Sequence, residues 1–301
     1  MHQWSTKTYL TFCHQQGQEY EQDERELWQE VMPKEALRLK YLLNSTFAVT
    51  SLHMASLADH PVTREQYVTA AVEYHNASLA HFMQAWPQVT EHSCRAIYVT
   101  SMGYFVLTMA MPHIAPMRGE PQTVEQSIFA LLVLYKGPRR LLRMFGEQLT
   151  ARPLGATFAK KDMRQFSRRD EKFLQALDRL RRINDMQYSK HFLNFHKANQ
   201  AALRELQECS TRFINGVDMA IIGWLTLLDD DFIDLLQQHQ NLAILIMMHW
   251  AVLLERPMEA WWLLRSGRAL VYELSESLSD LTRDEQEARD WCQLQVSSPN
   301  S

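Results

Sequence analysis

The sequence predicts an all-α fold: a single large helical domain built around a buried central helix at about 232–254. Glycine and proline are sparse, with 9 and 10 in 301 residues, and leucine, alanine, glutamine and arginine are plentiful, a mixture that favours helices over strands. Apolar residues recur at helical spacing along most of the chain. Within the central helix, residues 242–254 are apolar at every position except His249. Such a run has no polar face to turn toward water, so it must be covered on all sides.

The composition also limits the classes of function and the cellular location that can be expected. A hydrophobic content of 46% suffices for a sizeable core, and a formal net charge of −4 gives no overall attraction to nucleic acid or anionic membrane. The apolar run is too short to cross a bilayer, so no membrane span is expected. The cysteines, at 13, 94, 209 and 292, lack metal-ligand spacing, and no signal peptide is apparent. A reducing compartment, nucleus or cytoplasm, fits this pattern.

The N-terminal part predicts two helices separated by a polar stretch. Residues 1–12 form a short apolar-faced segment, and the acidic stretch 15–26 is expected to be a solvated loop. A long helix over 35–58 follows Pro33, which suits a first helical turn. It ends before Pro61. The other expected helices, bounded by proline, glycine or loss of apolar periodicity, are 63–83, 93–111, 126–135, 139–149, 189–228 and 259–281.

Two segments differ from this helical pattern. In 158–182 lysine and arginine outnumber aspartate and glutamate, which indicates either a solvated helix face or a mobile segment joining two helical halves. From residue 282 the chain is mostly polar. We therefore expect a helical domain over 1–281, with the basic segment inside it, and a polar C-terminal tail at 282–301.

The sharpest local motif is the D-D-x-x-D formed by Asp230, Asp231 and Asp234. On a helix Asp230 and Asp234 lie one turn apart on one face, where their carboxylates could share Mg²⁺, as in class I terpene cyclases. The alternative is helix capping, because acids preceding an apolar helix bind its free N–H groups. A cyclase also needs a second metal motif, and the nearest candidate, beginning at Asn184, has its serine one place late and lacks the glutamate.

Soft and aromatic side chains suggest a second kind of site. They are usually core packing, yet they could also line a pocket for a sterol or another isoprenoid-sized ligand. Histidines within apolar helical patterns have the same two interpretations. The pocket candidates are His53, Tyr104, Phe105, Met248, His249, Trp250, Trp261 and Trp262. The sequence contains no phosphate-binding glycine loop, no G-x-S-x-G motif and no H-E-x-x-H motif, so it does not indicate a hydrolase or a kinase.

The order of several degenerate segments carries a family resemblance. The opening MHQWSTKT is similar to "L-x-H-x-(F/Y/W)-x-T-x-T", and 42–55 is similar to "L-L-H-A-I-L-A-L-S-A-L-H-L-A", with His53 at the matching histidine. Further matches lie at 67–79, 134–142, 231–254 and the Trp261-Trp262 to Gly267 segment. Together they resemble the C-terminal regulatory domain of fungal zinc-binuclear-cluster transcription factors, in the branch that includes sterol-uptake regulators. The Trp often found after Gly267 is Arg268 here.

The resemblance implies a nuclear transcriptional regulator of a sterol or secondary-metabolite pathway, with cytoplasm as the alternative location. It implies a hydrophobic effector or a co-regulator protein as partner, no cofactor, and an arrangement that could be a homodimer. The family's six-cysteine DNA-reading cluster does not occur in this sequence, so no direct DNA contact is expected from this chain. The rival hypothesis is a Mg²⁺-dependent, sesquiterpene-cyclase-like lyase that uses Asp230, Asp231 and Asp234 on prenyl diphosphate.

Overall fold

The structure of the chain is a computed structural model that describes residues 1–13, 21–114, 123–134, 136–150, 168–187, 193–212, 219–255, 260–263 and 266–297. Within these ranges all regular structure is helical, which confirms the predicted all-α fold. The elements are α1 His2–Thr6, η1 Thr8–Phe12, α2 Glu21–Arg25, η2 Glu26–Val31, α3 Met32–Ala36, α4 Lys40–Ser56, α5 Pro61–Ala85, η3 Trp86–Gln88, α6 Cys94–Ile114, α7 Val124–Leu134, α8 Lys136–Thr150, α9 Arg168–Met186, α10 Leu193–Arg212, α11 Met219–Leu227, α12 Asp230–Gln237, α13 Asn241–Leu254, α14 Ser266–Glu276 and α15 Arg283–Ser297.

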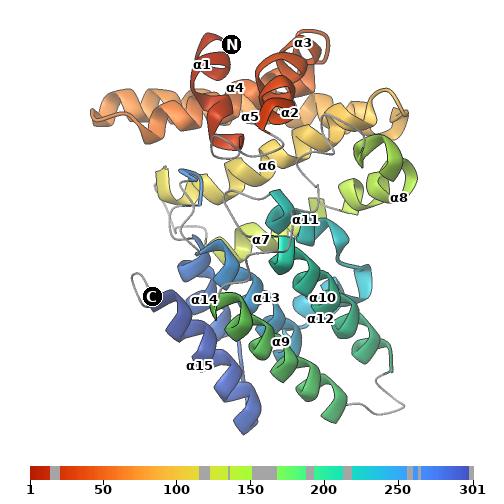
Figure 1. Cartoon of the computed structure of the whole chain (residues 1–301). Coiled ribbons are helices and arrows are strands. Elements are labelled where there is room, and N and C mark those ends of the chain that lie inside the picture. The colour runs from red at the N-terminus through yellow and green to blue at the C-terminus, as the bar shows by residue number, and fades with distance from the viewer. Residues whose placement is uncertain are drawn as a thin grey trace.

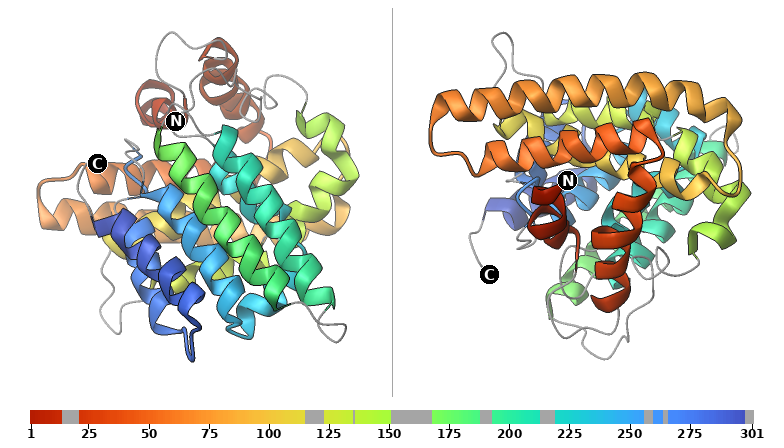
Figure 2. Two further views of the ribbon diagram at one scale, coloured as in Figure 1. Left: turned by 60° about the horizontal axis from the view of Figure 1, so that its bottom comes forward. Right: turned by 90° about the horizontal axis from the view of Figure 1, so that it is seen from above.

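The first packing centre is built from α4, α5 and α6, which cross the upper part of the molecule (Figure 1). Helices α4 and α5 are long antiparallel neighbours, seen from above in Figure 2. Pro61 occupies the first turn of α5, and the Nδ1 atom of His60 accepts the Val62 N–H at 3.3 Å. Helix α6 approaches α4 so closely that a Cβ atom at Gly103 would overlap the Ser45 hydroxyl.

The second packing centre surrounds α13, which packs against α9, α10, α11, α12, α14 and α15. Every residue in 242–254 is buried, as an apolar run without a polar face requires. Helix α7 lies between the two centres and contacts both α6 and α14. Its N-terminus is held by Glu273 of α14, which accepts the Glu125 N–H at 2.7 Å.

The prediction of one continuous helix over 232–254 is wrong. The chain forms α12 and α13, with a turn at Gln238–Gln240 between them. The Gln240 N–H binds the Leu235 carbonyl and the His239 N–H binds the Leu236 carbonyl, each at 3.0 Å, while His239 has a φ of 51°. This is the Schellman arrangement that ends helices, with histidine where glycine is usual. Five polar residues in a row, QQHQN at 237–241, interrupt the apolar pattern at this point and mark the turn in the sequence.

The described part of the stretch expected as a polar tail, 282–301, is a packed helix. Residues up to Ser297 form α15, which packs against α9, α13 and α14. Its buried side chains are Glu285, Ala288, Cys292 and Val296. Their spacing of three or four residues places them on one helix face, so a mostly polar helix still contributes to the core.

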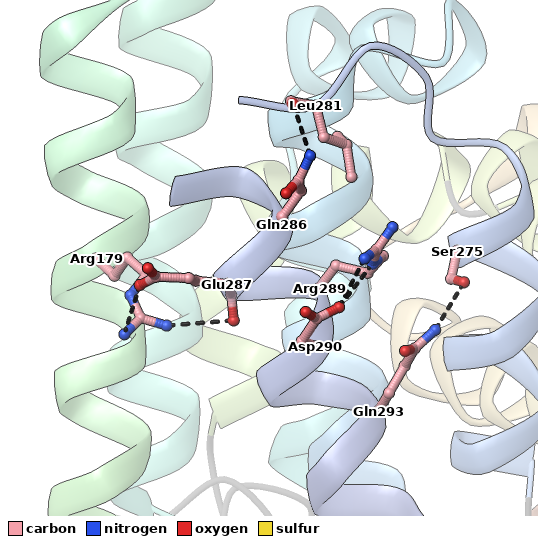
Figure 3. Close-up of polar contacts among 8 residues, drawn as sticks. All are labelled: Arg179, Ser275, Leu281, Gln286, Glu287, Arg289, Asp290 and Gln293. Atoms are coloured by element: carbon pink, nitrogen blue, oxygen red, sulfur yellow. Dashed lines mark hydrogen bonds and ion pairs between the residues drawn. The ribbon is translucent and has the colours of Figure 1, made fainter. Parts of the chain in front are cut away.

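Polar contacts at the surface also join α15 to its neighbours (Figure 3). Arg179 of α9 donates to the Glu287 carbonyl at 3.3 Å and lies 3.6 Å from its carboxylate. On the other side, the Gln293 amide donates to the Ser275 hydroxyl of α14 at 2.9 Å. These contacts fix the register of α15 on the domain.

The basic segment, 158–182, is only partly described, because 158–167 lie outside the described residues. The rest belongs to α9, which buries Phe173, Leu177 and Leu180. In this described part the charged residues share an amphipathic helix with core positions.

In the part of the chain that the structure describes, one helix, α6, is long and apolar enough to cross a membrane. Most of its apolar window is buried inside the protein, as expected of a core helix.

Candidate functional site

The acidic motif lies at the N-terminus of α12, where its aspartates have separate environments. The carboxylate of Asp229 accepts the Phe232 N–H at 2.7 Å and therefore caps the helix. Asp230 accepts a hydrogen bond from the Nη2 atom of Arg139 at 3.1 Å. Asp231 and Asp234 are exposed.

Arg139 of α8 is the unusual member of this contact, because its side chain is only 4% exposed whereas that of Asp230 is 65% exposed. Burial lowers the pKa of the guanidinium, and the nearby Asp230 opposes that shift. Its second terminal nitrogen, Nη1, has no hydrogen-bond partner among the described residues. The pair therefore serves to compensate a buried cation.

These residues do not fit the predicted Mg²⁺ site. The carboxylate of Asp230 compensates a buried cation, and those of Asp231 and Asp234 are exposed. The positive end of the helix dipole, which opposes a bound cation, faces the group. Among the described residues, no three His, Cys, Asp or Glu side chains are grouped so that they could hold a metal.

Replacing Asp230 by Asn is expected to lower the free energy of unfolding by about 1–2 kcal/mol, because Arg139 would stay buried without a charged partner. The matched change Asp234→Asn, on an exposed acid of the same helix, is expected to cost less than about 0.5 kcal/mol. Urea denaturation at pH 7 measures both values. Equal effects of the two substitutions would contradict the role assigned to the Arg139 pair.

The pocket candidates outside α13 make contacts within the protein. The Nδ1 atom of His53 forms a hydrogen bond with the Thr8 hydroxyl at 2.9 Å. The imidazole ring also stacks on Trp261, with 4.8 Å between the ring centroids. Tyr104 shares a 2.9 Å hydrogen bond with Ser78. Phe105 and Trp262 make an edge-to-face contact at 5.8 Å, and the Trp262 indole N–H has no acceptor among the described residues.

The candidates in α13 are also buried. Met248 is a core residue, and Trp250 donates to the Ile221 carbonyl at 2.9 Å. The Nδ1 atom of His249 donates to the Leu245 carbonyl at 2.7 Å, since a carbonyl can only accept. Burial lowers the pKa of His249 to about 4, so this histidine is neutral at physiological pH. None of the eight candidates lines either of the two cavities described below.

A different part of the molecule forms a cavity of about 640 Å³. Its walls come from the end of α9, the start of α10, the α12–α13 turn and the α14–α15 turn. In the left view of Figure 2 these helix ends gather along the lower edge. The volume is within the range of small-molecule sites, which is about 300–1,000 Å³.

The wall between α9 and α10 is a chain of amide groups. The Asn184 side-chain NH₂ donates to the His196 carbonyl at 3.0 Å, so its Oδ1 is left to accept. Asn199 donates to that oxygen at 3.4 Å. Asn199 is 7% exposed, and its own Oδ1 has no donor among the described residues. The cavity thus borders on a buried acceptor that lacks its hydrogen bond.

The opposite wall is formed by two turns with left-handed backbone. His239 and Asp280 have φ values of 51° and 50°, and they are the only non-glycine residues with positive φ in the described ranges. Both line the cavity. Asn241 ties the two turns together, because its amide donates to the Ser279 carbonyl at 2.7 Å. Such strained conformations are often found at functional sites.

This cavity is not predicted from the sequence, in which Asn184 stands out only as part of an incomplete metal motif. One available signal was Thr282-x-x-Glu285, a capping box that marks the start of α15. The other polar residues have the spacing of an ordinary solvated helix face, and nothing in the sequence distinguishes them from one.

Comparison with known proteins gives no relative for the chain: no family model, no curated protein and no solved structure matches it.

Proposed function

We propose that this chain is a regulatory domain of the fungal transcription-factor type, and that its effector is a small polar molecule bound in the cavity between α9, α10 and the two turns. The cavity, with the buried unpartnered oxygen of Asn199, is the observation that carries the effector site. Its lining includes Phe195, Leu235 and Leu242 beside amides, imidazoles and carboxylates, and these polar groups favour a polar effector over the hydrophobic one that the resemblance implies. The regulatory role rests on the order of segments in the sequence.

The position of the cavity suits a regulator because it joins elements distant in sequence. A ligand held by Asn199 on one side and by the α12–α13 and α14–α15 turns on the other would favour one arrangement of these helices. A ligand shifts such an equilibrium by its difference in affinity for the two arrangements. The surface that changes would then meet a co-regulator or a DNA-reading module.

A tethered reporter tests this function. The chain is fused to an unrelated DNA-binding module, and transcription is measured for the wild type and for Asn199→Leu, which keeps the volume but removes the acceptor. We expect the tethered chain to change transcription, and Asn199→Leu to alter that change by about tenfold, equivalent to 1.4 kcal/mol of effector binding. Asn194→Leu, at an exposed position of α10, is the matched control.

A tethered wild-type chain without effect on transcription would contradict the regulatory role. Incubation with farnesyl diphosphate and Mg²⁺ tests the rival hypothesis of a terpene cyclase. A Mg²⁺-dependent hydrocarbon product would establish the cyclase and overturn the proposal.

A further inference from the structure

The carboxylate of Glu285 is buried in the wall of the cavity, with 3% of the residue exposed. Its Oε1 accepts from the Gln187 amide at 3.0 Å. Its Oε2 accepts from the Thr282 N–H at 2.9 Å and from the Thr282 hydroxyl at 2.8 Å. All of these donors are neutral. The negative charge is therefore hydrogen-bonded, and it lies in the first turn of α15, where the helix dipole favours an anion, but no described cation pairs with it.

A second carboxylate, that of Asp280, lies at the exposed rim of the same cavity. No described residue forms an ion pair with it. The cavity lining contains no lysine or arginine, so two acidic groups face it without a protein cation. Opposite charge supplied by a ligand would be stabilised here more strongly than in water, because the low-dielectric walls reduce screening.

Arginines do occur nearby, in a neighbouring cavity of about 480 Å³ that shares Asn184. They are occupied by other groups. Arg181 donates to Asp178 at 2.6 Å and to the Gln207 side chain, and Arg204 pairs with Glu205 at 3.0 Å. Their charges are therefore compensated within α9 and α10 and do not neutralise Glu285.

The third observation is independent of charge. The unpartnered Oδ1 of Asn199 requires a hydrogen-bond donor, and its orientation is fixed, because the amide nitrogen must face the accepting oxygen of Asn184. A buried acceptor without a donor costs about 1–3 kcal/mol. A ligand that brings N–H groups would satisfy it. A protonated amine would supply both the positive charge and the donor.

We propose that the cavity binds a small aliphatic amine that carries one or two ammonium groups at neutral pH. An ammonium offers three donors and a positive charge, which match the Asn199 oxygen and the carboxylates of Glu285 and Asp280. The inference rests on the proposed effector role of the cavity and specifies its ligand class.

Isothermal titration of the full chain tests the ligand class with defined probes. The amines are ethanolamine and 1,4-diaminobutane; the neutral and anionic counterparts of the diamine are 1,4-butanediol and butanedioate. We expect saturable binding of at least one amine, and an affinity at least about tenfold lower for both counterparts. Binding of the diol or of butanedioate as tight as that of the amines would overturn the proposal, as would the absence of saturable binding by either amine.

Two conservative variants locate the bound amine. Asp280→Asn removes the charge, and asparagine tolerates the left-handed backbone of this position. Glu285→Gln removes the charge and keeps an acceptor for the Thr282 capping box. Each is expected to weaken amine binding by about tenfold or more. Asp284→Asn is the matched control, since it removes an exposed acid next to Glu285 that does not line the cavity.

An equal loss of affinity in Asp284→Asn would show that general charge, rather than the cavity, attracts the amine. Thermal unfolding of each variant without ligand shows whether it is folded. The outcome is separable from that of the reporter experiment. Amine binding without a transcriptional effect would support the binding site and contradict the regulatory role. A reporter response that depends on Asn199, without amine binding, would support the regulatory role and contradict the proposed ligand class.

Discussion

Replacing Gly267 by alanine is expected to destabilise the protein by about 3 kcal/mol, because overpacking against fixed backbone has no cheap relief. Gly267 lies at the start of α14, where this helix meets the end of α13. A Cβ atom there would be 2.5 Å from the Ala251 carbonyl oxygen and 2.7 Å from the Glu255 nitrogen. Both neighbours are backbone atoms of a fully buried helix or its cap, so α14 would have to move away.

Urea denaturation of Gly267→Ala measures this loss, with Gly223→Ala as the matched control. Gly223 lies within α11, and a Cβ atom there would meet nothing within 4 Å. Alanine is the better helix former, so the control is expected to be neutral or to gain up to about 1 kcal/mol. A Gly267→Ala protein as stable as the wild type would mean that α13 and α14 are not in close contact.

The second large effect is a loss of stability in acid caused by His249. Its folded-state pKa is lowered from 6.5 to about 4, chiefly by burial, while the hydrogen bond to Leu245 opposes the shift. Between these values the unfolded chain binds a proton that the folded protein excludes. The free energy of unfolding therefore rises with pH in this window. As the pH falls from 6.5 to 4, about 3 kcal/mol of stability is lost, at 1.36 kcal/mol per pKa unit.

The variant His249→Phe isolates this contribution. Phenylalanine cannot be protonated and keeps a ring to stack on Trp291, which lies at 5.0 Å with an interplanar angle of 9°. Denaturation at pH 7 and pH 4 gives the change in stability for each protein, and the wild type is expected to lose about 3 kcal/mol more than the variant. His92→Gln, at an exposed position, is expected to keep the wild-type difference. An unchanged pH dependence in His249→Phe would show that His249 is not buried in the neutral form.

Several features of the protein followed from the sequence because they depend on local chemistry. The all-α class follows from composition and spacing, and the complete burial of 242–254 follows from a run with no polar face. The capping interpretation of the acidic motif was open beside the metal one, and Asp229 provides the cap. The position of these acids, directly before an apolar helix, is what indicates a helix cap.

Other features depended on contacts between distant segments. Arg268 stands where the resembled family often has tryptophan, and no role for it is predicted from the sequence. In the structure its Nε atom donates to the Val296 carbonyl at 2.8 Å, and its backbone N–H donates to Glu255 at 3.0 Å. It thereby joins α13, α14 and α15. No local pattern predicts this contact, because the partners lie on separate helices.

By itself, the sequence determined which residues share a helix face, since the helical repeat fixes that relation along the chain. The tertiary structure decided which faces meet. It placed a mostly polar α15 in the core and brought Asn199, Asp280 and Glu285 to one cavity. The physical reason is that a polar residue has the same spacing whether it faces solvent or a cavity, and only the packing of other helices over it distinguishes the two.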